Sequence, residues 1–257
     1  MPVTIYALSL TAPDGESLVD RLYHTAPAVR RSVADSYRRE EDRCRFLASR
    51  ALLSLALRDK TEKKGLEDAA LRRTPAGKPY LVDAPHIDFS LSHSGSWVLC
   101  ALSLAEGGSS TEDVRAAHPV GCDVEAFPAG RSPERLDSLA RRILPPDEYR
   151  LWQSDDDHKG RCRRFAHAWA IRESAVKALG CGLTVPLRAL HTDTENGLIT
   201  AVDDRIPLPE GYCLRFCEKT LPGGYAAACS LLMPAVVGSP HDAPHFSFRF
   251  IDPAVHF

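Results

Sequence analysis

The sequence predicts an α+β fold in two subdomains, and three observations lead to it. Segments that alternate like β-strands and segments with helical periodicity both occur in each half of the chain. A Gly/Ser-rich loop followed by polar residues spans 105–119 and is the best candidate boundary. The 257 residues, 44% of them hydrophobic, suffice for one large domain or two of ordinary size. We therefore expect subdomains at 1–117 and 118–236, followed by a tail at 237–257.

The first subdomain is expected to combine an opening strand, a helical region and a pair of strands. Its helical region carries a row of leucines beside a cluster of arginines, which predicts one apolar and one charged face. A Thr-Pro-Ala-Gly-Lys-Pro cluster predicts a turn. The segments are a strand at 3–10, helix-rich sequence at 27–58, the turn at 74–79, and strands at 87–91 and 97–104 around Ser-His-Ser-Gly-Ser at 92–96.

The second subdomain is expected to contain one dominant helix and a sheet. That helix runs from about 161 to 179 and ends at a Gly-Cys-Gly segment, because glycine commonly follows a helix C-terminus. By its pattern the stretch from Val237 onward belongs to neither subdomain, and we expect it to pack back through its phenylalanines at 246–250. The other segments are a strand at 120–125, helices at 134–144 and 146–153, and strands at 188–194, 197–202, 211–218 and 224–232.

Charge and cysteine usage narrow the class of protein. A formal net charge of −2 gives no overall electrostatic signal for nucleic acid. The eight cysteines are scattered, with no CxxC spacing and no Cys/His quartet, which favours free thiols in a reducing compartment. The N-terminus lacks a basic segment followed by a long apolar core, and no apolar run is long enough to span a membrane. We expect a soluble cytoplasmic protein.

Two acidic motifs about fifty residues apart point to chemistry. Asp123 and Glu125 lie two residues apart on a predicted strand, so both face the same side. Glu173 and Lys177 are one helical turn apart and share a helix face. Three carboxylates with one ammonium suit a Mg²⁺-pyrophosphate site, because the metal neutralises phosphate charge and the lysine holds a phosphate oxygen. A buried salt-bridge network would satisfy the same charges, and spacing alone leaves both readings open.

Further polar segments could face a phosphorylated ligand. Ser92, His93 and Ser94 supply hydroxyls and an imidazole between two strands, although a lone histidine is more often structural. The 77–79 turn carries a lysine that could reach a nucleotide, or it is an ordinary turn. The arginines at 30–50 suit a phosphorylated small molecule or form a solvated helix face, and charge alone favours the second.

Taken in order, these motifs resemble the surfactin-synthetase-activating type of 4'-phosphopantetheinyl transferase. The resemblance covers roughly residues 37–232 and rests on four motifs in the family's order. They are Gly77-Lys78-Pro79, Ser92-His93-Ser94, the Gly-Cys-Asp-Val-Glu strand at 121–125, and the Trp169–Gly180 helix. The resemblance implies two similar α+β halves related by a pseudo-twofold axis, with coenzyme A in the cleft between them.

The resemblance also implies a role for each matching residue. Asp123, Glu125 and Glu173 would bind Mg²⁺, or Mn²⁺, and Glu173 would also act as general base. Lys177 would hold the pyrophosphate, while Glu148 matches an acid near the metal in some members. The nucleotide and its phosphates would be bound by Lys78, Ser92 and His93 and by a basic residue at Arg45, for which Arg43 or Arg50 could substitute. One departure is Arg172, where the family has lysine; we expect activity to survive, with less certain hydrogen bonds around Glu173.

The implied reaction moves the 4'-phosphopantetheine arm of coenzyme A onto a serine of an apo acyl or peptidyl carrier protein and releases 3',5'-ADP. We expect a monomer, because two fused halves would complete one site. The segment 131–144 is a candidate docking surface for acidic carrier proteins, unless it is an ordinary amphipathic helix packed on its own subdomain. Competing hypotheses are a Mg²⁺-dependent phosphohydrolase or nuclease, and a non-catalytic module that binds coenzyme A or a carrier protein.

Overall fold

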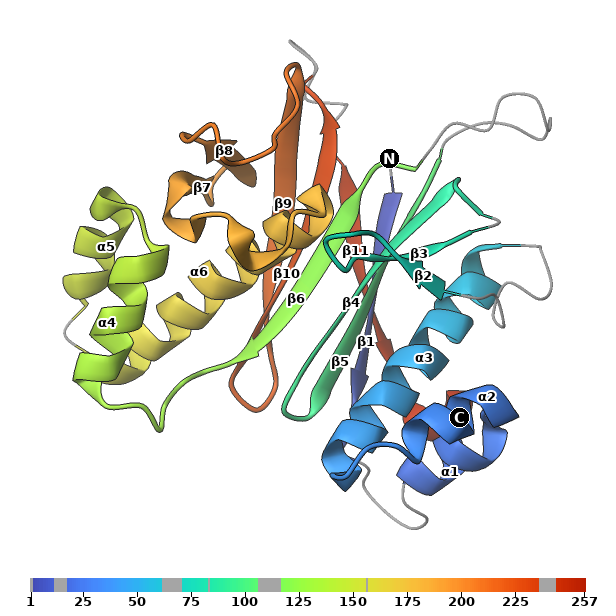
Figure 1. Cartoon of the computed structure of the whole chain (residues 1–257). Coiled ribbons are helices and arrows are strands. Elements are labelled where there is room, and N and C mark those ends of the chain that lie inside the picture. The colour runs from blue at the N-terminus through green and yellow to red at the C-terminus, as the bar shows by residue number, and fades with distance from the viewer. Residues whose placement is uncertain are drawn as a thin grey trace.

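The computed structural model describes residues 2–11, 18–61, 71–82, 84–105, 117–155, 157–235 and 244–257. It confirms the α+β fold: two mainly antiparallel sheets stand side by side, and a long helix covers each of them (Figure 1). The segments 106–116 and 236–243 lie outside the described residues, so the predicted loop and the start of the predicted tail do too. The subdomain limits stay a prediction.

The first sheet has the strand order β11-β1-β5-β4. Its strands are β1 (Pro2–Ser9), β4 (Ile87–Ser94), β5 (Trp97–Leu104) and β11 (His245–Ile251). Helix α3 (Glu40–Lys60) packs on this sheet, with α1 (Leu18–Thr25) and α2 (Ala28–Ala34) against its other side (Figure 1). Four of the five leucines of α3 are buried and Leu55 is partly buried, which agrees with the apolar face that the sequence predicts. A separate hairpin consists of β2 (Leu71–Arg73) and β3 (Pro79–Leu81).

The second sheet has the strand order β6-β10-β9-β8-β7 and is covered by α6 (His158–Leu179). The Asp157 carboxylate caps the first turn of α6, and Gly180 ends the helix in a left-handed conformation with φ of 66°. The strands are β6 (Val120–Ala126), β7 (Leu190–Asp193), β8 (Leu198–Ala201), β9 (Tyr212–Leu221) and β10 (Tyr225–Pro234). Helices α4 (Pro133–Ile143) and α5 (Pro146–Gln153) pack outside α6, and the 3₁₀ turns η2 (Gly182–Thr184) and η3 (Leu187–Ala189) follow it.

The two sheets meet along β4 and β6, which lie side by side without backbone pairing (Figure 1). Every second side chain of β4 accepts a hydrogen bond from every second backbone N–H of β6. The pairs are Asp88 with Val120 at 2.7 Å, Ser90 with Cys122 at 3.0 Å, Ser92 with Val124 at 3.3 Å, and Ser94 with Ala126 at 3.3 Å. This β4–β6 ladder fixes the register between the halves and supplies acceptors for an edge strand.

An apolar cluster shared by both sheets reinforces this joint. It includes Ile5 and Leu99 from the first sheet and Cys122 and Leu231 from the second, each completely buried. All eight cysteines are free thiols, and several, such as Cys122, serve here as small apolar side chains. None of the helices in the described part of the chain is long and apolar enough to cross a membrane.

Three local features differ from the sequence prediction. The segment 92–94 belongs to β4 rather than to the connection, which is only the turn after Ser94. Helix α1 and the β2–β3 hairpin were not predicted, because each is too short for its periodicity to stand out. The segment assigned to the tail contains β11, which pairs in parallel with β1; Phe246 and Phe248 pack against the shared cluster, and the Phe250 ring contacts Trp97.

Gly121 in β6 allows α6 to lie directly on the strand. A Cβ atom at this position would come within 1.9 Å of the Ser174 carbonyl oxygen. We expect Gly121→Ala to lower the free energy of unfolding by about 3 kcal/mol or more, because backbone atoms of the helix must move. Gly130→Ala is the matched control, since its Cβ would meet no atom within 4 Å. Equal denaturant midpoints for the two variants would contradict this packing.

Candidate active site

The site is built on β6 and α6, where they face each other beside β4. The Lys177 ammonium of α6 lies 2.6 Å from Asp123 Oδ1 of β6 and 3.1 Å from the Cys122 carbonyl oxygen. Ser92 of β4 joins the same group, with its Oγ 2.7 Å from Asp123 Oδ1 and 3.1 Å from Lys177 Nζ. The structure therefore brings together residues that the sequence places more than 80 positions apart.

The contacts of Ser92 determine the direction of its hydroxyl. Lys177 Nζ and the backbone N–H of Val124 can only donate to its oxygen. The hydroxyl hydrogen is therefore left for Asp123 Oδ1. Ser92 thus orients one oxygen of a buried carboxylate and leaves the other carboxylate oxygen of Asp123 to other partners.

Glu173 is the most perturbed acid of the site. Only 8% of its surface is exposed, and its Oε1 atom is buried without a hydrogen-bond partner among the described residues. Burial, followed by repulsion from Asp123 and Glu125, raises the pKa of Glu173 to about 7, although Lys177 opposes the shift. A carboxylate with this pKa can accept a proton near neutral pH and can also receive a cation.

Glu125 belongs to the same electrostatic group. Burial and the neighbouring Asp123 raise its pKa, while Arg131 and Lys177 lower it. As placed, however, no three Asp, Glu, His or Cys side chains in the described ranges converge closely enough to hold a metal ion. Lys177 instead neutralises Asp123 directly. Magnesium commonly uses one or two carboxylates, several waters and substrate phosphates, so the donor set fits Mg²⁺ bound together with a phosphate ligand.

Arg45 and His93 lie together on the first-subdomain side. Arg45 Nε donates to the Gly95 carbonyl oxygen at 3.3 Å, and its other nitrogens pair with Asp42 and Glu41. The His93 side chain is exposed at the end of β4; partial desolvation and then the charge of Arg45 lower its pKa. Arg50 is half-buried further along α3.

The predicted turn connects β2 and β3. Gly77 has φ of +91°, a conformation that favours glycine, and Pro79 begins β3. The Lys78 ammonium does not point into open space: it lies 2.6 Å from Asp88 Oδ2 and 3.1 Å from the Val120 carbonyl oxygen. Its predicted contact with a nucleotide stays a prediction.

Two family models match the chain and cover different halves of it. Residues 119–230 match the 4'-phosphopantetheinyl transferase superfamily, and residues 18–105 match the N-terminal region of 4'-phosphopantetheinyl transferases. The second match contains the Ser-His-Ser segment, and the first contains all three acids of the site. The chain belongs to the 4'-phosphopantetheinyl transferase superfamily.

Curated relatives agree with this assignment along most of the chain. A 4'-phosphopantetheinyl transferase of Bacillus subtilis is 26% identical over 81% of this chain and 82% of its own length. The Sfp transferase of Bacillus subtilis strain 168 is 26% identical over 88% of this chain and 91% of its own. A solved holo-(acyl-carrier-protein) synthase from Bacillus anthracis, in complex with CoA (3',5'-ADP), matches 46% of this chain and 96% of its own with 20% identity and a TM-score of 0.35.

Glu148 and Arg172 form a buried pair within the second half of the transferase. Arg172 is completely buried and donates to Glu148 Oε2 at 2.6 Å and to the Leu190 carbonyl oxygen at 2.9 Å. Glu148 Oε1 accepts from Thr192. The described hydrogen bonds of Arg172 do not include Glu173, although the two are neighbours in sequence. Arg172 therefore connects α5, α6 and β7. It points away from Glu173, the acid whose hydrogen bonds it was expected to affect.

The candidate docking segment at 131–144 folds as an amphipathic helix on its own subdomain. Its Leu136, Ile143 and Leu144 side chains are buried in the core around α6, and Leu139 is partly buried. Since the apolar residues are occupied internally, an apolar docking face on this helix is not supported. Its exposed arginines, Arg131, Arg135, Arg141 and Arg142, remain on the surface.

Asp88 is a residue of this region that was not predicted from the sequence; it accepts hydrogen bonds from Lys78 and Val120. A signal was present, because Asp88, Ser90, Ser92 and Ser94 place polar side chains at every second position of a strand. Such a period usually indicates a solvent-exposed face, whereas here the row faces the neighbouring strand β6.

The raised pKa of Glu173 makes stability depend on pH. The folded protein holds a proton there up to about pH 7, whereas an ordinary glutamate loses it near 4.5. The folded state thus binds more protons between these values, so the free energy of unfolding falls as pH rises through this window, by about 2 to 3 kcal/mol. Urea denaturation in EDTA at pH 5 and pH 8 tests this. If the free energy of unfolding of Glu173→Gln falls by the same amount between pH 5 and pH 8, groups other than Glu173 cause the pH dependence.

Proposed function

We propose that the chain transfers the 4'-phosphopantetheine arm of coenzyme A to a serine of an apo acyl or peptidyl carrier protein and releases 3',5'-ADP. One observation carries the proposal. Glu173 is a buried carboxylate with a pKa of about 7, and its Oε1 atom has no hydrogen-bond partner among the residues that the structure describes. It lies one helical turn from Lys177 and within electrostatic reach of Asp123. This arrangement offers a base, a phosphate-binding cation and metal-binding oxygens in one place.

The reaction assigns a distinct task to Glu173. The carrier serine oxygen attacks the β-phosphorus of coenzyme A, forming a phosphodiester bond to the serine. The bond from this phosphorus to the oxygen that bridges the pyrophosphate breaks, and 3',5'-ADP leaves with that electron pair. The serine hydroxyl proton passes to Glu173, directly or through one water, because a base with pKa near the working pH is best suited to accept it.

Lys177, together with a metal ion bound by the acids, would neutralise the negative charge of the pyrophosphate. Lys177 would hold a phosphate oxygen with the ammonium that lies against Asp123 in the absence of substrate. Asp123, Glu125 and the buried Oε1 atom of Glu173 would hold Mg²⁺, with Mn²⁺ as the alternative. When bound, the ion would stabilise charge on the transferring phosphorus and on the leaving group.

The nucleotide side of the cleft would come from the first half of the chain. Arg45 or Arg50 would bind the 3'-phosphate, and Ser92 and His93 would lie along the phosphates. The 77–79 turn would border the nucleotide. Support for this comes from the position of Ser92, which bonds both Asp123 and Lys177.

The partners follow from the same reaction. We propose apo acyl and peptidyl carrier proteins, in the cytoplasm, as the acceptors. One chain contributes the whole site, so a monomer is expected. A hydrodynamic radius that matches a dimer at every concentration would contradict that expectation.

The decisive experiment is the intact mass of an apo-acyl carrier protein and an apo-peptidyl carrier protein, each incubated with the chain, coenzyme A and Mg²⁺. We expect a gain of one phosphopantetheine on at least one carrier, and none with EDTA or with Glu173→Ala. Coenzyme A cleaved with no change in either carrier would indicate a phosphohydrolase instead. Coenzyme A bound without cleavage or transfer would indicate a non-catalytic binding module.

A further inference from the structure

Lys78 bridges the two halves of the molecule from a turn of the first half. Its ammonium contacts Asp88 of β4 at 2.6 Å and the carbonyl oxygen of Val120 in β6 at 3.1 Å. The same Asp88 Oδ2 atom also accepts from the Val120 backbone N–H at 2.7 Å. One lysine and one aspartate thus contact both backbone polar groups of the first residue of the strand that carries Asp123 and Glu125.

The turn that carries Lys78 is fixed at its base. The Thr74 N–H donates to the Lys78 carbonyl oxygen, and the Lys78 N–H donates to Thr74 Oγ1. The turn also reaches the end of α6, because Cβ atoms placed on Gly180 and Gly182 would lie 3.7 Å from Lys78 and 3.5 Å from the Ala76 carbonyl oxygen. The hairpin therefore acts as a strap across the C-terminal end of the helix that carries Glu173 and Lys177.

Releasing Lys78 from this position is unfavourable. The Lys78 and Asp88 side chains are only 14% and 21% exposed. If the ammonium moved to a ligand phosphate, the Asp88 carboxylate would keep backbone hydrogen bonds with Val120 and Phe89 but would lose its cation in a poorly solvated place. Burial already raises the pKa of Asp88 against the effect of Lys78, which shows how weakly this carboxylate is solvated.

We propose that Lys78 and Asp88 are positioning residues that fasten β6 to the first half, and that the Lys78 ammonium does not bind the 3'-phosphate of coenzyme A. This rests on the proposed function and departs from the role that the family resemblance gives to Lys78. The negative charge of the nucleotide phosphates would then be neutralised by the arginines of α3, with His93 beside them.

Ligand selectivity tests this directly. The dissociation constants of coenzyme A and 3'-dephospho-coenzyme A are measured by calorimetry for the wild type, Lys78→Met and Lys78→Arg. We expect Lys78→Met to weaken the binding of both ligands by the same factor. The ratio of the dissociation constant of 3'-dephospho-coenzyme A to that of coenzyme A should then stay within about twofold of the wild-type ratio. Lys78→Arg should restore the binding of both ligands. A ratio reduced about tenfold or more would mean that Lys78 makes a charge-assisted bond to the 3'-phosphate, which would overturn the proposal. Arg45→Gln and Arg50→Gln are the comparison variants, and the ratio is expected to fall for the arginine that binds the 3'-phosphate.

A double-mutant cycle tests the fastening without any ligand. Lys78→Met, Asp88→Asn and the double variant are compared by denaturant midpoint. We expect each single change to lower the midpoint and the double change to lower it by clearly less than the sum. The pair Asp203 and Arg205, 2.6 Å apart with side chains that are 27% and 68% exposed, is the control, and a clearly smaller departure from additivity is expected there. Additive effects at Lys78 and Asp88 would refute the fastening.

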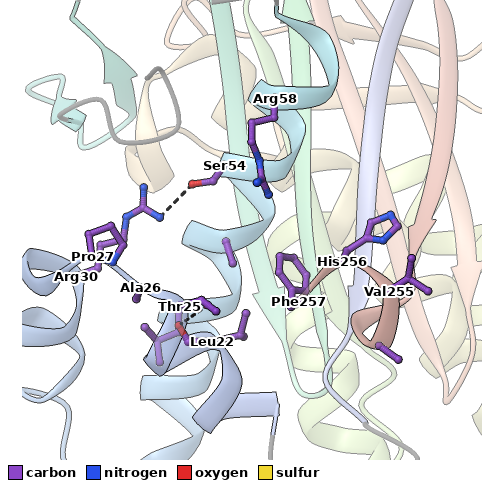
Figure 2. A pocket seen from close by; sticks show the side chains of 13 residues that line it. Leu22, Thr25, Ala26, Pro27, Arg30, Ser54, Arg58, Val255, His256 and Phe257 are labelled. Atoms are coloured by element: carbon purple, nitrogen blue, oxygen red, sulfur yellow. Dashed lines mark hydrogen bonds between the residues drawn. The ribbon is translucent and has the colours of Figure 1, made fainter. Parts of the chain in front are cut away.

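The two tests separate this inference from the proposed function. If the wild type binds neither ligand, the proposed function fails, while the cycle still decides whether Lys78 fastens the two halves. If both ligands bind and the cycle is additive, the inference alone fails. Figure 2 shows a pocket between α1, α3 and α7 (Pro253–His256), lined by Leu22, Arg30, Ser54 and Phe257 among others. Its lining includes no residue of the β2–β3 hairpin, so it is a different site from the one argued here.

Discussion

Replacing Glu173 by glutamine is expected to lower the transfer rate by about 10²- to 10⁴-fold, the usual range for the loss of a general base. The stability of the folded protein should not decrease. The carboxylate is buried, is repelled by Asp123 and Glu125, and has one oxygen with no hydrogen-bond partner in the described part of the chain. Glutamine removes that repulsion at nearly the same volume, so the free energy of unfolding at pH 8 should rise by about 1 to 2 kcal/mol.

The measurement combines single-turnover transfer to an apo-carrier with urea denaturation of the same preparations. Glu210→Gln is a suitable control, because Glu210 is an exposed acid in the same half of the chain. A Glu173→Gln variant that is both inactive and less stable would show that the acid has a structural role. Undiminished turnover would remove Glu173 from the mechanism altogether.

Replacing Lys177 by methionine is expected to have the opposite effect on stability. Lys177 neutralises Asp123 and opposes the raised pKa values of Glu125 and Glu173. Without the ammonium, a carboxylate that is only 8% exposed is left with the Ser92 hydroxyl as its described side-chain partner. We expect a loss of about 3 kcal/mol, at the low end for a buried pair because Lys177 is itself 31% exposed. Transfer should fall by about 10²-fold or more, because a phosphate contact is lost.

A second variant identifies the cause of the instability. Asp123→Asn added to Lys177→Met should recover most of the lost stability, since no uncompensated charge remains, while activity stays absent. Lys159→Met controls for the removal of an exposed lysine from the same helix. If the double variant is less stable than Lys177→Met, the loss must come from packing of the lysine side chain rather than from charge.

Long elements with local signals could be predicted from the sequence. Helices α3 and α6 have an apolar face or a glycine stop, and β9 and β10 are long runs rich in apolar residues. The strand β11 could not be placed, because its partner β1 lies more than 240 residues away and the pairing is parallel. Such contacts depend on tertiary structure and leave no mark in a local window.

The candidate site could be predicted as a set of residues but not as a set of contacts. The spacing of Asp123, Glu125, Glu173 and Lys177 follows from strand and helix periods, and the structure places these residues within electrostatic reach of one another. The pairing of Lys177 with Asp123 and of Arg172 with Glu148 depends on which elements pack together. Lys78 shows the difference most clearly, since only the three-dimensional arrangement reveals that Asp88 is its partner.

The β4–β6 ladder also limits how the chain can change in length. The hydrogen bonds of the ladder recur every two residues, so the register of β4 against β6 is fixed along the whole contact. One residue inserted between Asp88 and Ser94 would present Phe89 or Leu91 to the backbone N–H groups of β6 instead of a hydroxyl. The acids of β6 would then lose their alignment with Ser92. A substitution at one of the four acceptors removes a single hydrogen bond of the ladder, whereas a single insertion or deletion displaces every acceptor beyond it.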